Sequence, residues 1–121
     1  MSRDRGSATI WVLACISLLA LVTVAATMRS AAILARHRAE SAADLAALAA
    51  ATGLGRTADP CSLAYTVAAL NGAEVSNCTV EAAEAAQAGS VRVWVTRELH
   101  LPILGTRQVT ARARAARVAP T

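Results

Sequence analysis

The stretch ATIWVLACISLLALVTVAATMRSAAILARHRAESAADLAALAAAT, residues Ala8–Thr52, decides the fold. Its first half, Ala8–Met28, has no charged residue and is about as long as a helix must be to cross a hydrocarbon core. Its second half, Arg29–Thr52, is charged but contains no Gly or Pro, and most of its residues are good helix formers. The first helix-stopping signal is Gly53-Leu54-Gly55. The stretch therefore predicts one helix of roughly 45 residues.

The composition leaves room for one small domain after this helix. The chain has 121 residues, of which 55% are hydrophobic and only 2% aromatic, so its core must consist mostly of Ala, Val and Leu. The net charge is +4, and all basic residues are Arg. These Arg are scattered along the sequence, which is typical of solvated faces, so a nucleic-acid partner is not favoured.

The apolar half of the helix predicts a single-pass membrane anchor. A cleaved signal peptide is the alternative, but the apolar run is longer than the hydrophobic region of such peptides. Arg residues flank the run on both sides, so the positive-inside rule gives no orientation. Two Cys in the later chain favour an extracytoplasmic domain. We expect a cytoplasmic head (1–7), a transmembrane helix in the cell membrane (8–28), a soluble continuation of the helix (29–52) and a small extracytoplasmic α+β domain (53–121).

The soluble continuation of the helix has two kinds of apolar face. One is an apolar stripe formed by the Leu residues of a set at 3–4 spacing: Leu34, Arg38, Ser41, Leu45, Leu48 and Thr52. The other is a row of small residues at every fourth position, Ala39, Ala43, Ala47 and Ala51, beside a second row at Ala42, Ala46 and Ala50. Small residues at this spacing leave a shallow groove that allows close helix packing. We expect the Ala39–Ala51 row to pack against a neighbouring subunit; the alternative is that it receives the chain's own sheet.

The remaining residues predict a short helix and three strands. Asp59-Pro60 is typical of a helix start, so the helix covers about Cys61–Leu70. The apolar period then changes to two, which predicts strands at Glu74–Glu81, Ser90–Leu99 and Gln108–Val118. Residues 82–89 form a connection with room for a helical turn, and residues 101–105 form a break. The expected fold class is α+β and pilin-like: a long N-terminal helix, a short second helix and a three-stranded antiparallel meander.

The sequence contains no group of residues that predicts an enzyme. His37 lies on a helix flank and His100 beside a turn, positions that are typical of surface residues. Glu40 and Asp44 are one helical turn apart, which is common on solvated helices. The sequence has no Gly-rich phosphate loop, no CxxC motif and no zinc-ligand spacing. We therefore expect no catalytic residue, no metal, no cofactor and no small-molecule substrate.

Three Cys are present, and two of them predict a disulfide. Cys15 lies in the apolar run, where Cys acts as a small hydrophobic residue. Cys61 opens the short helix and Cys78 lies in the first strand. A bond between them would close a loop of about 17 residues and stabilise the domain by roughly 3 kcal/mol in the chain-entropy model. The alternative is a pair of free thiols in a cytoplasmic domain.

Two stretches resemble a known family. Asp4–Thr9 (DRGSAT) leads into the apolar helix. Arg36–Ala51 (RHRAESAADLAALAAA) is similar to the pattern Arg-x-x-Ala-Gln-x-Ala-Ala-Asp-x-Ala-Ala-Leu-Ala, which follows the membrane helix of TadE/TadG-like proteins. These are minor pseudopilins of the tight-adherence (Flp) type IV pilus system. The chain resembles above all the short TadE-like branch of high-GC Gram-positive bacteria.

The resemblance implies a structural subunit of a pilus or of a type II/IV-like secretion apparatus. Its partners would be other pseudopilins and platform proteins. In prepilins a peptidase cuts after a Gly before the apolar helix, and Gly6-Ser7 is the candidate site here. Trp11 occupies the position where prepilins carry Glu. Two other classes stay open: a generic membrane-anchored binding module, and a nucleic-acid-binding pilin-like protein in DNA uptake, which would show salt-dependent DNA affinity.

Overall fold

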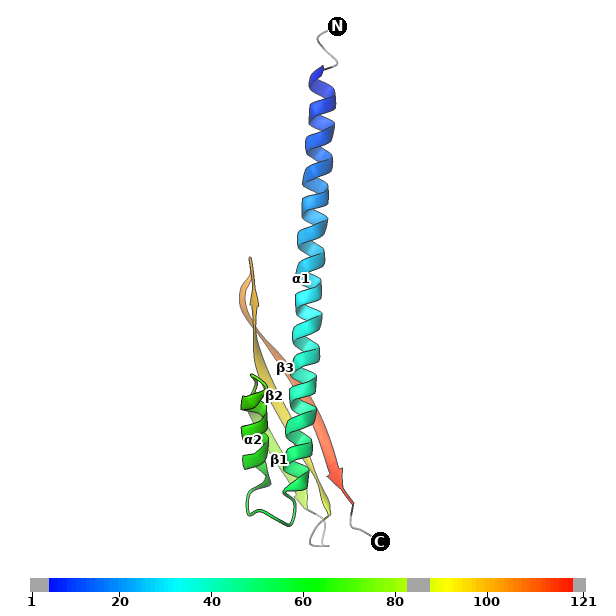
Figure 1. Ribbon diagram of the computed structural model, residues 1–121. Coiled ribbons are helices and arrows are strands. Elements are labelled where there is room, and N and C mark those ends of the chain that lie inside the picture. The colour runs from blue at the N-terminus through cyan, green and yellow to red at the C-terminus, as the bar shows by residue number, and fades with distance from the viewer. Residues whose placement is uncertain (1–4, 83–87, 119–121) are drawn as a thin grey trace. The chain divides into compact units, whose positions relative to one another are not determined.

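The computed structural model of the protein describes residues 5–82 and 88–118, and its elements confirm the α+β class (Figure 1). In chain order they are α1 (Arg5–Thr52), α2 (Pro60–Leu70), β1 (Glu74–Ala82), β2 (Gly89–Leu101) and β3 (Gly105–Arg117). The chain divides into two units, Met1–Ala32 and Ile33–Thr121. The second unit therefore contains the C-terminal part of α1 together with the later elements. The helical turn considered for residues 82–89 falls on 83–87, outside the described residues.

Helix α1 ends at Thr52, where the sequence predicted its stop. Gly53 is buried immediately after it. A Cβ at this position would lie 2.9 Å from Cδ1 of Leu63 in α2 and 3.2 Å from the carbonyl oxygen of Ala50. Gly therefore suits this corner, because a larger residue would make the Leu63 side chain shift and would crowd the Ala50 carbonyl oxygen.

Helix α2 begins as the sequence predicted. Asp59 has extended backbone angles, and its Oδ1 accepts a hydrogen bond from the backbone N–H of Cys61 at 3.1 Å. Pro60 occupies the first turn, where its missing N–H has no intrahelical partner to lose. Asn71 caps the other end, where its backbone N–H bonds the carbonyl oxygens of Val67 and Ala68.

The three strands form an antiparallel sheet in the order β1-β2-β3, which is the predicted meander. A bulge at Ser76 interrupts the pairing of β1 with β2. The β2–β3 hairpin is longer than predicted, because Leu99, His100 and Leu101 pair with Arg107, Thr106 and Gly105. The apolar-polar alternation fades near its tip, whereas backbone pairing continues. Gly105 has a φ of 76°, a backbone conformation that favours glycine at this turn.

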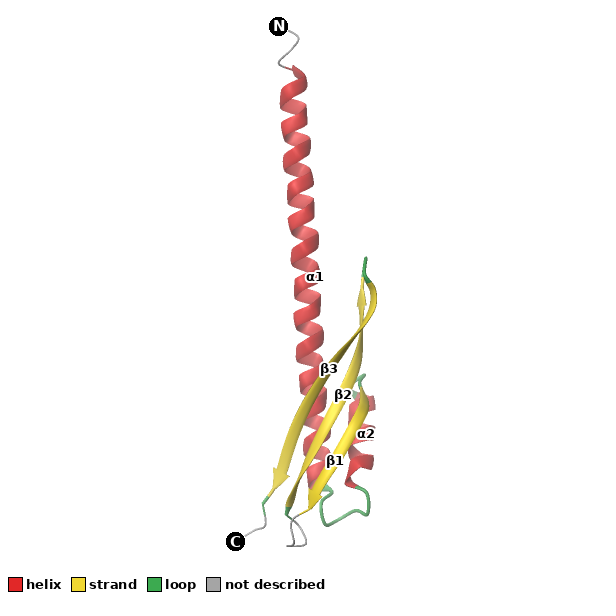
Figure 2. Ribbon diagram, turned by 180° about the vertical axis from the view of Figure 1, so that it is seen from behind, coloured by secondary structure: helices red, strands yellow, loops and turns green. Residues whose placement is uncertain are grey.

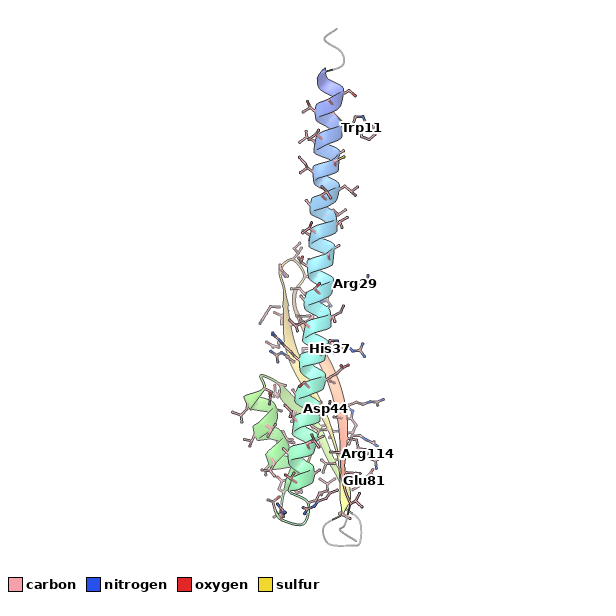
Figure 3. All side chains as sticks on the ribbon, turned by 45° about the vertical axis from the view of Figure 1, so that its right-hand side comes forward. Trp11, Arg29, His37, Asp44, Glu81 and Arg114 are labelled. Atoms are coloured by element: carbon pink, nitrogen blue, oxygen red, sulfur yellow. A yellow bond between two sulfur atoms is a disulfide. The ribbon has the colours of Figure 1, made fainter. Side chains whose placement is uncertain are left out.

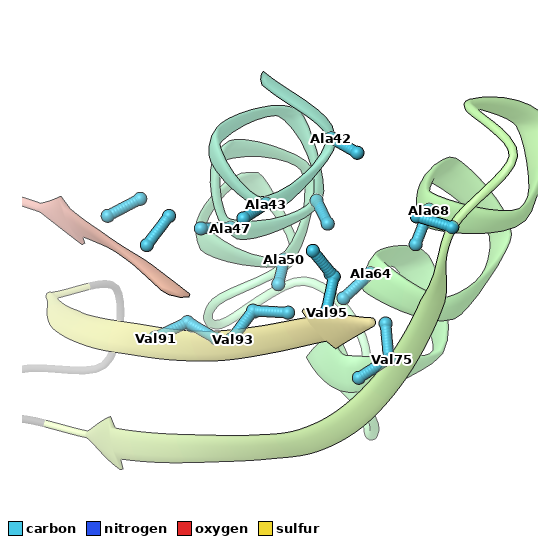
Figure 4. Packing of buried hydrophobic residues seen from close by; sticks show 14 of the residues in the cluster. Ala42, Ala43, Ala47, Ala50, Ala64, Ala68, Val75, Val91, Val93 and Val95 are labelled. Atoms are coloured by element: carbon cyan, nitrogen blue, oxygen red, sulfur yellow. The ribbon is translucent and has the colours of Figure 1, made fainter. Parts of the chain in front are cut away.

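The core lies between one face of the sheet and the two helices (Figures 2 and 4). Its largest fully buried side chains are Val91, Val93 and Val95 of β2, as the period of two predicted. The helices contribute small residues, among them Ala64 and Ala68 of α2, which are fully buried. Figure 2 shows the opposite face of the sheet, which neither helix covers.

Candidate functional site

The Ala face of α1 is buried inside the chain's own core. It comprises Ala35, Ala39, Ala42, Ala43, Ala46, Ala47, Ala50 and Ala51, of which all but Ala35 belong to one cluster with the Val residues of β2. The row Ala39, Ala43, Ala47 and Ala51 is at most 5% exposed. The structure thus corrects the prediction that this row packs against a neighbouring subunit. The chain's own sheet covers it, because a single methyl at each position lets β2 and β3 lie close to the helix.

The Leu face of α1, which we define as Leu34, Leu45 and Leu48, is exposed on the side away from the Ala face. These side chains are 50%, 44% and 56% exposed, respectively. Ser41 and Thr52 lie in the same stripe and are also exposed. An open hollow of about 320 Å³ adjoins the end of this face, lined by Leu48, Ala51, Thr52, Arg56, Ala116 and Arg117. Leu48 lines this hollow and Leu45 lies one helical turn before it, so this end of the face is the candidate interaction surface.

The unit Met1–Ala32 exposes nearly all of its large apolar side chains. Within the described residues, one helix, α1, is long and apolar enough to cross a membrane, and no residue of its most apolar stretch is buried. Trp11 is 70% exposed and projects from the helix (Figure 3). Gly6 and Ser7, the candidate processing site, lie exposed in the first turn of α1. The hydroxyl groups of Ser17, Thr23, Thr27 and Ser30 donate to carbonyl oxygens of the helix itself, as Ser17 Oγ does to that of Leu13 at 2.8 Å.

Cys61 and Cys78 form a disulfide that ties α2 to β1. Their Cα atoms are 6.1 Å apart, and 17 residues separate them in sequence. Asp59 fixes the start of α2 and thereby places Cys61 beside the strand. Cys15, in the apolar part of α1, is free and exposed.

The uncovered face of the sheet gathers Arg residues that the sequence showed only as scattered. Arg92 pairs directly across the strands with Arg114, and Trp94 pairs with Arg112. The guanidinium of Arg92 lies 5.8 Å from the Trp94 ring centroid, within cation–π range. Arg114 donates from Nη2 to Oε2 of Glu81 at 3.3 Å and to Oγ of Ser90 at 3.0 Å. The Glu81 carboxylate offsets part of the repulsion between the facing guanidinium groups.

His37 and Glu40 lie together on the exposed surface of α1, whereas His100 lies on the β2–β3 hairpin. His37 Nδ1 is 3.6 Å from Oε2 of Glu40, and Oε1 of the same carboxylate accepts from Nε of Arg36 at 2.9 Å. His100 Nδ1 is 3.2 Å from Oγ1 of Thr106. In the described part of the chain, no group of three or more His, Cys, Asp or Glu is placed to hold a metal ion.

Two Arg residues cap helix ends through contacts that sequence analysis missed. Arg117 of β3 donates from Nη1 to the carbonyl oxygens of Thr52 and Leu54, at 3.3 and 3.1 Å. Arg97 of β2 donates from Nη1 to the carbonyl oxygen of Asn71 at 2.9 Å. A cation at a helix C-terminus satisfies free carbonyls and complements the helix dipole. These partners are far apart in sequence, so local patterns carry no signal for them.

The comparisons with known proteins identify the family of this helix-and-sheet arrangement. No curated protein and no solved structure matches the chain. A family model does match, over residues 6–89, which include all of the apolar part of α1, α2 and β1. This match covers more than half of the sequence and agrees with the resemblance carried by Arg36–Ala51. The chain therefore belongs to the Tad family, the TadE/G-like proteins of Flp pilus assembly.

Proposed function

We propose that the protein is a TadE-like minor pseudopilin, a non-enzymatic structural subunit of a Flp pilus or a related secretion apparatus. In this proposal Ala8–Met28 anchors it in the cell membrane, and residues 53–121 form a domain outside the cytoplasm. The observation that carries the proposal is the exposed Leu face of α1. The chain buries its Ala face and leaves Leu34, Leu45 and Leu48 in contact with water, although burying a Leu gains more hydrophobic free energy than burying an Ala.

The partner of the Leu face is, in this proposal, another pseudopilin or a platform protein. The hollow at Leu48 and Ala116 extends the face at its end and offers a concave seat for a partner's side chains. Inside the membrane, helix association depends on close packing rather than on the hydrophobic effect. Outside the membrane, burial of the Leu face against a partner gains hydrophobic free energy. The Leu face therefore supports assembly through a driving force that the membrane segment lacks.

In vivo crosslinking tests this role. A photo-crosslinking residue at Leu45 should capture other subunits of the apparatus, whereas the same residue at Tyr65 of α2 should not. Tyr65 is a matched control because it is 53% exposed, close to the 44% of Leu45. With the crosslinking residue kept at position 45, the variant Leu34→Gln/Leu48→Gln should lose the capture while the protein level holds. Equal capture at both positions, or none at either, would favour the generic membrane-anchored module.

Protease accessibility tests the proposed topology. A protease added to intact spheroplasts should cut in the exposed loop at Arg56 and remove the later domain. Full protection would place the domain in the cytoplasm. Processing between Gly6 and Ser7 stays a prediction. Intact mass analysis of the protein without added protease tests it.

A second candidate function, binding of nucleic acid, is favoured by one observation, the Arg residues around Trp94 on the uncovered sheet face. Aromatic rings and guanidinium groups together stack bases and contact phosphates. DNA affinity that falls steeply with salt, and that is lost in Arg92→Ala/Arg112→Ala, would support this function. Glu74, Glu81 and Glu98 also lie on the sheet and reduce its positive potential, so the structural role is the better supported.

A further inference from the structure

The tip of the β2–β3 hairpin is apolar and exposed. Residues 99–104 read LHLPIL and are all apolar except His100. Ile103 is 69% exposed and Leu104 is 59% exposed. The pairing of β1 with β2 stops at Glu74 and Thr96, so beyond that point the hairpin continues as a two-stranded ribbon. A two-stranded ribbon has less support than the three-stranded part of the sheet, so its apolar tip would gain from contact with another surface.

The register of the sheet places this tip at the Ile33 end of the domain. Arg117, at the far end of β3, hydrogen-bonds the carbonyl oxygens of Thr52 and Leu54. The thirteen residues of β3 extend about 43 Å at the rise of a strand. The helix segment from Ile33 to Thr52 extends only about 29 Å. Figures 1 and 2 both show the hairpin running past α2 and β1 to reach this end.

Chain connectivity brings the membrane to the same end. The apolar run finishes at Met28, only five residues before Ile33, a span of about 7.5 Å in a helix. The bilayer surface that holds the anchor must therefore lie close to the Ile33 end of the domain, whatever the angle at which the anchor leaves it.

We propose that the apolar tip, Leu101–Leu104, inserts into the bilayer interface as a second, shallow membrane contact. This inference rests on the proposed membrane anchoring of α1. Charge supports the lipid as the occupant, because residues 99–107 contain no Asp or Glu and Arg107 flanks the tip. Arg36 and Arg38, both exposed, lie near the same end of the domain. Basic residues beside an apolar insertion are attracted to anionic lipid headgroups. The nearest acid, Glu98, lies on the ribbon before the tip.

Two contacts, one through α1 and one through the tip, would restrict how the domain tilts on the membrane. The anchor alone is a single tether and leaves the inclination of the domain free. With the tip inserted, that inclination is restricted, and the domain turns only about the membrane normal. The Leu face is then held at a constant height and angle to the membrane surface, which lowers the entropy cost of pairing it with a neighbour.

Depth-dependent fluorescence quenching tests the insertion. The full chain, in a Cys15→Ala background with the Cys61–Cys78 bond intact, is reconstituted in vesicles of phosphatidylcholine and phosphatidylglycerol. An environment-sensitive dye is attached at Ile103→Cys, at Leu18→Cys in the apolar run, or at Val118→Cys. Val118 is a matched control, since it is 83% exposed, is apolar and lies just after the opposite end of β3.

A quencher attached to lipid should reduce the emission at residue 18 and residue 103 several-fold more than at residue 118. A further substitution, Leu101→Ser/Leu104→Ser, should remove the quenching at residue 103 and leave that at residue 18 unchanged. If residue 18 is quenched and residue 103 behaves like residue 118, the tip does not enter the membrane. A blue-shifted dye at residue 103 that the lipid quencher does not reach would mean that protein covers the tip, which also overturns the inference. Loss of quenching at residue 18 would overturn the anchoring itself.

Discussion

The two apolar faces of α1 between Ile33 and Thr52 differ in burial. The face made of methyl groups is buried under the chain's own sheet, whereas the face that carries the larger Leu side chains is in water. Hydrophobicity alone predicts the reverse, because a Leu side chain removes more apolar surface from water than an Ala side chain. The difference shows that close fit selects the face that folds against the sheet. The more hydrophobic face is then free for another molecule.

The largest expected effect on stability comes from removing the disulfide that holds α2 in the core beside the Ala face. The Cys61–Cys78 bond holds α2, with its buried Ala64 and Ala68, against β1. The variant Cys61→Ala/Cys78→Ala should lower the free energy of unfolding by about 3 kcal/mol. Urea unfolding of the full chain in detergent micelles measures this through Trp94 fluorescence in a Trp11→Leu background. Cys15→Ala is the control and should leave the free energy of unfolding unchanged. An equal decrease in Cys15→Ala would show that the disulfide is not what stabilises the packing of α2.

Overpacking the Ala face should cost somewhat less. Ala43 is fully buried, so Ala43→Leu inserts a large side chain between α1 and the sheet and should destabilise by about 1–3 kcal/mol. The same change at the exposed Ala69 of α2 keeps helix propensity and adds no clash. Urea unfolding of both variants decides the matter. Similar urea midpoints for the two variants would mean that the Ala face is loosely packed. Close fit would then not explain why this face is the one buried against the sheet.

Removing the Arg117 cap should have a smaller effect. Arg117→Ala loses two hydrogen bonds to carbonyl oxygens at the end of α1, and a partly exposed pair of this kind should stabilise by about 1 kcal/mol. Arg112→Ala, on the same strand and exposed, controls for the loss of an Arg. Hydrogen exchange at the last turn of α1 should rise for the first variant only.

Of the four changes, a substitution in the Leu face should have the smallest effect on stability. Leu48→Gln should change the unfolding free energy of the isolated protein by less than about 0.5 kcal/mol, because Leu48 is 56% exposed. The same urea assay in micelles measures it, beside Ala43→Leu. A loss as large as that of Ala43→Leu would mean that the Leu face contributes to the fold itself, and the contrast between the faces would disappear.

Much of this fold is predictable from local patterns. The alternation around Val91, Val93 and Val95 indicated the buried face of β2, and Asp59-Pro60 indicated the start of α2. The burial of the Ala face was not decided by the sequence, because both faces of α1 are apolar and the choice depends on a sheet whose strands lie far along the chain. The caps by Arg97 and Arg117 and the Arg92–Arg114 pair were missed for the same reason, since they depend on long-range register.

The outer edge of β3 affects how copies of the chain can meet at high density. A long strand with one unpaired edge is a template on which identical chains can add strands without limit. Strand β3 contains Arg107, Arg112, Arg114 and Arg117 and no acidic residue. If two such edges met, rows of like charge would come together, and their repulsion opposes the pairing. Pairing of two β3 edges is therefore disfavoured even where copies of the chain come together at high density.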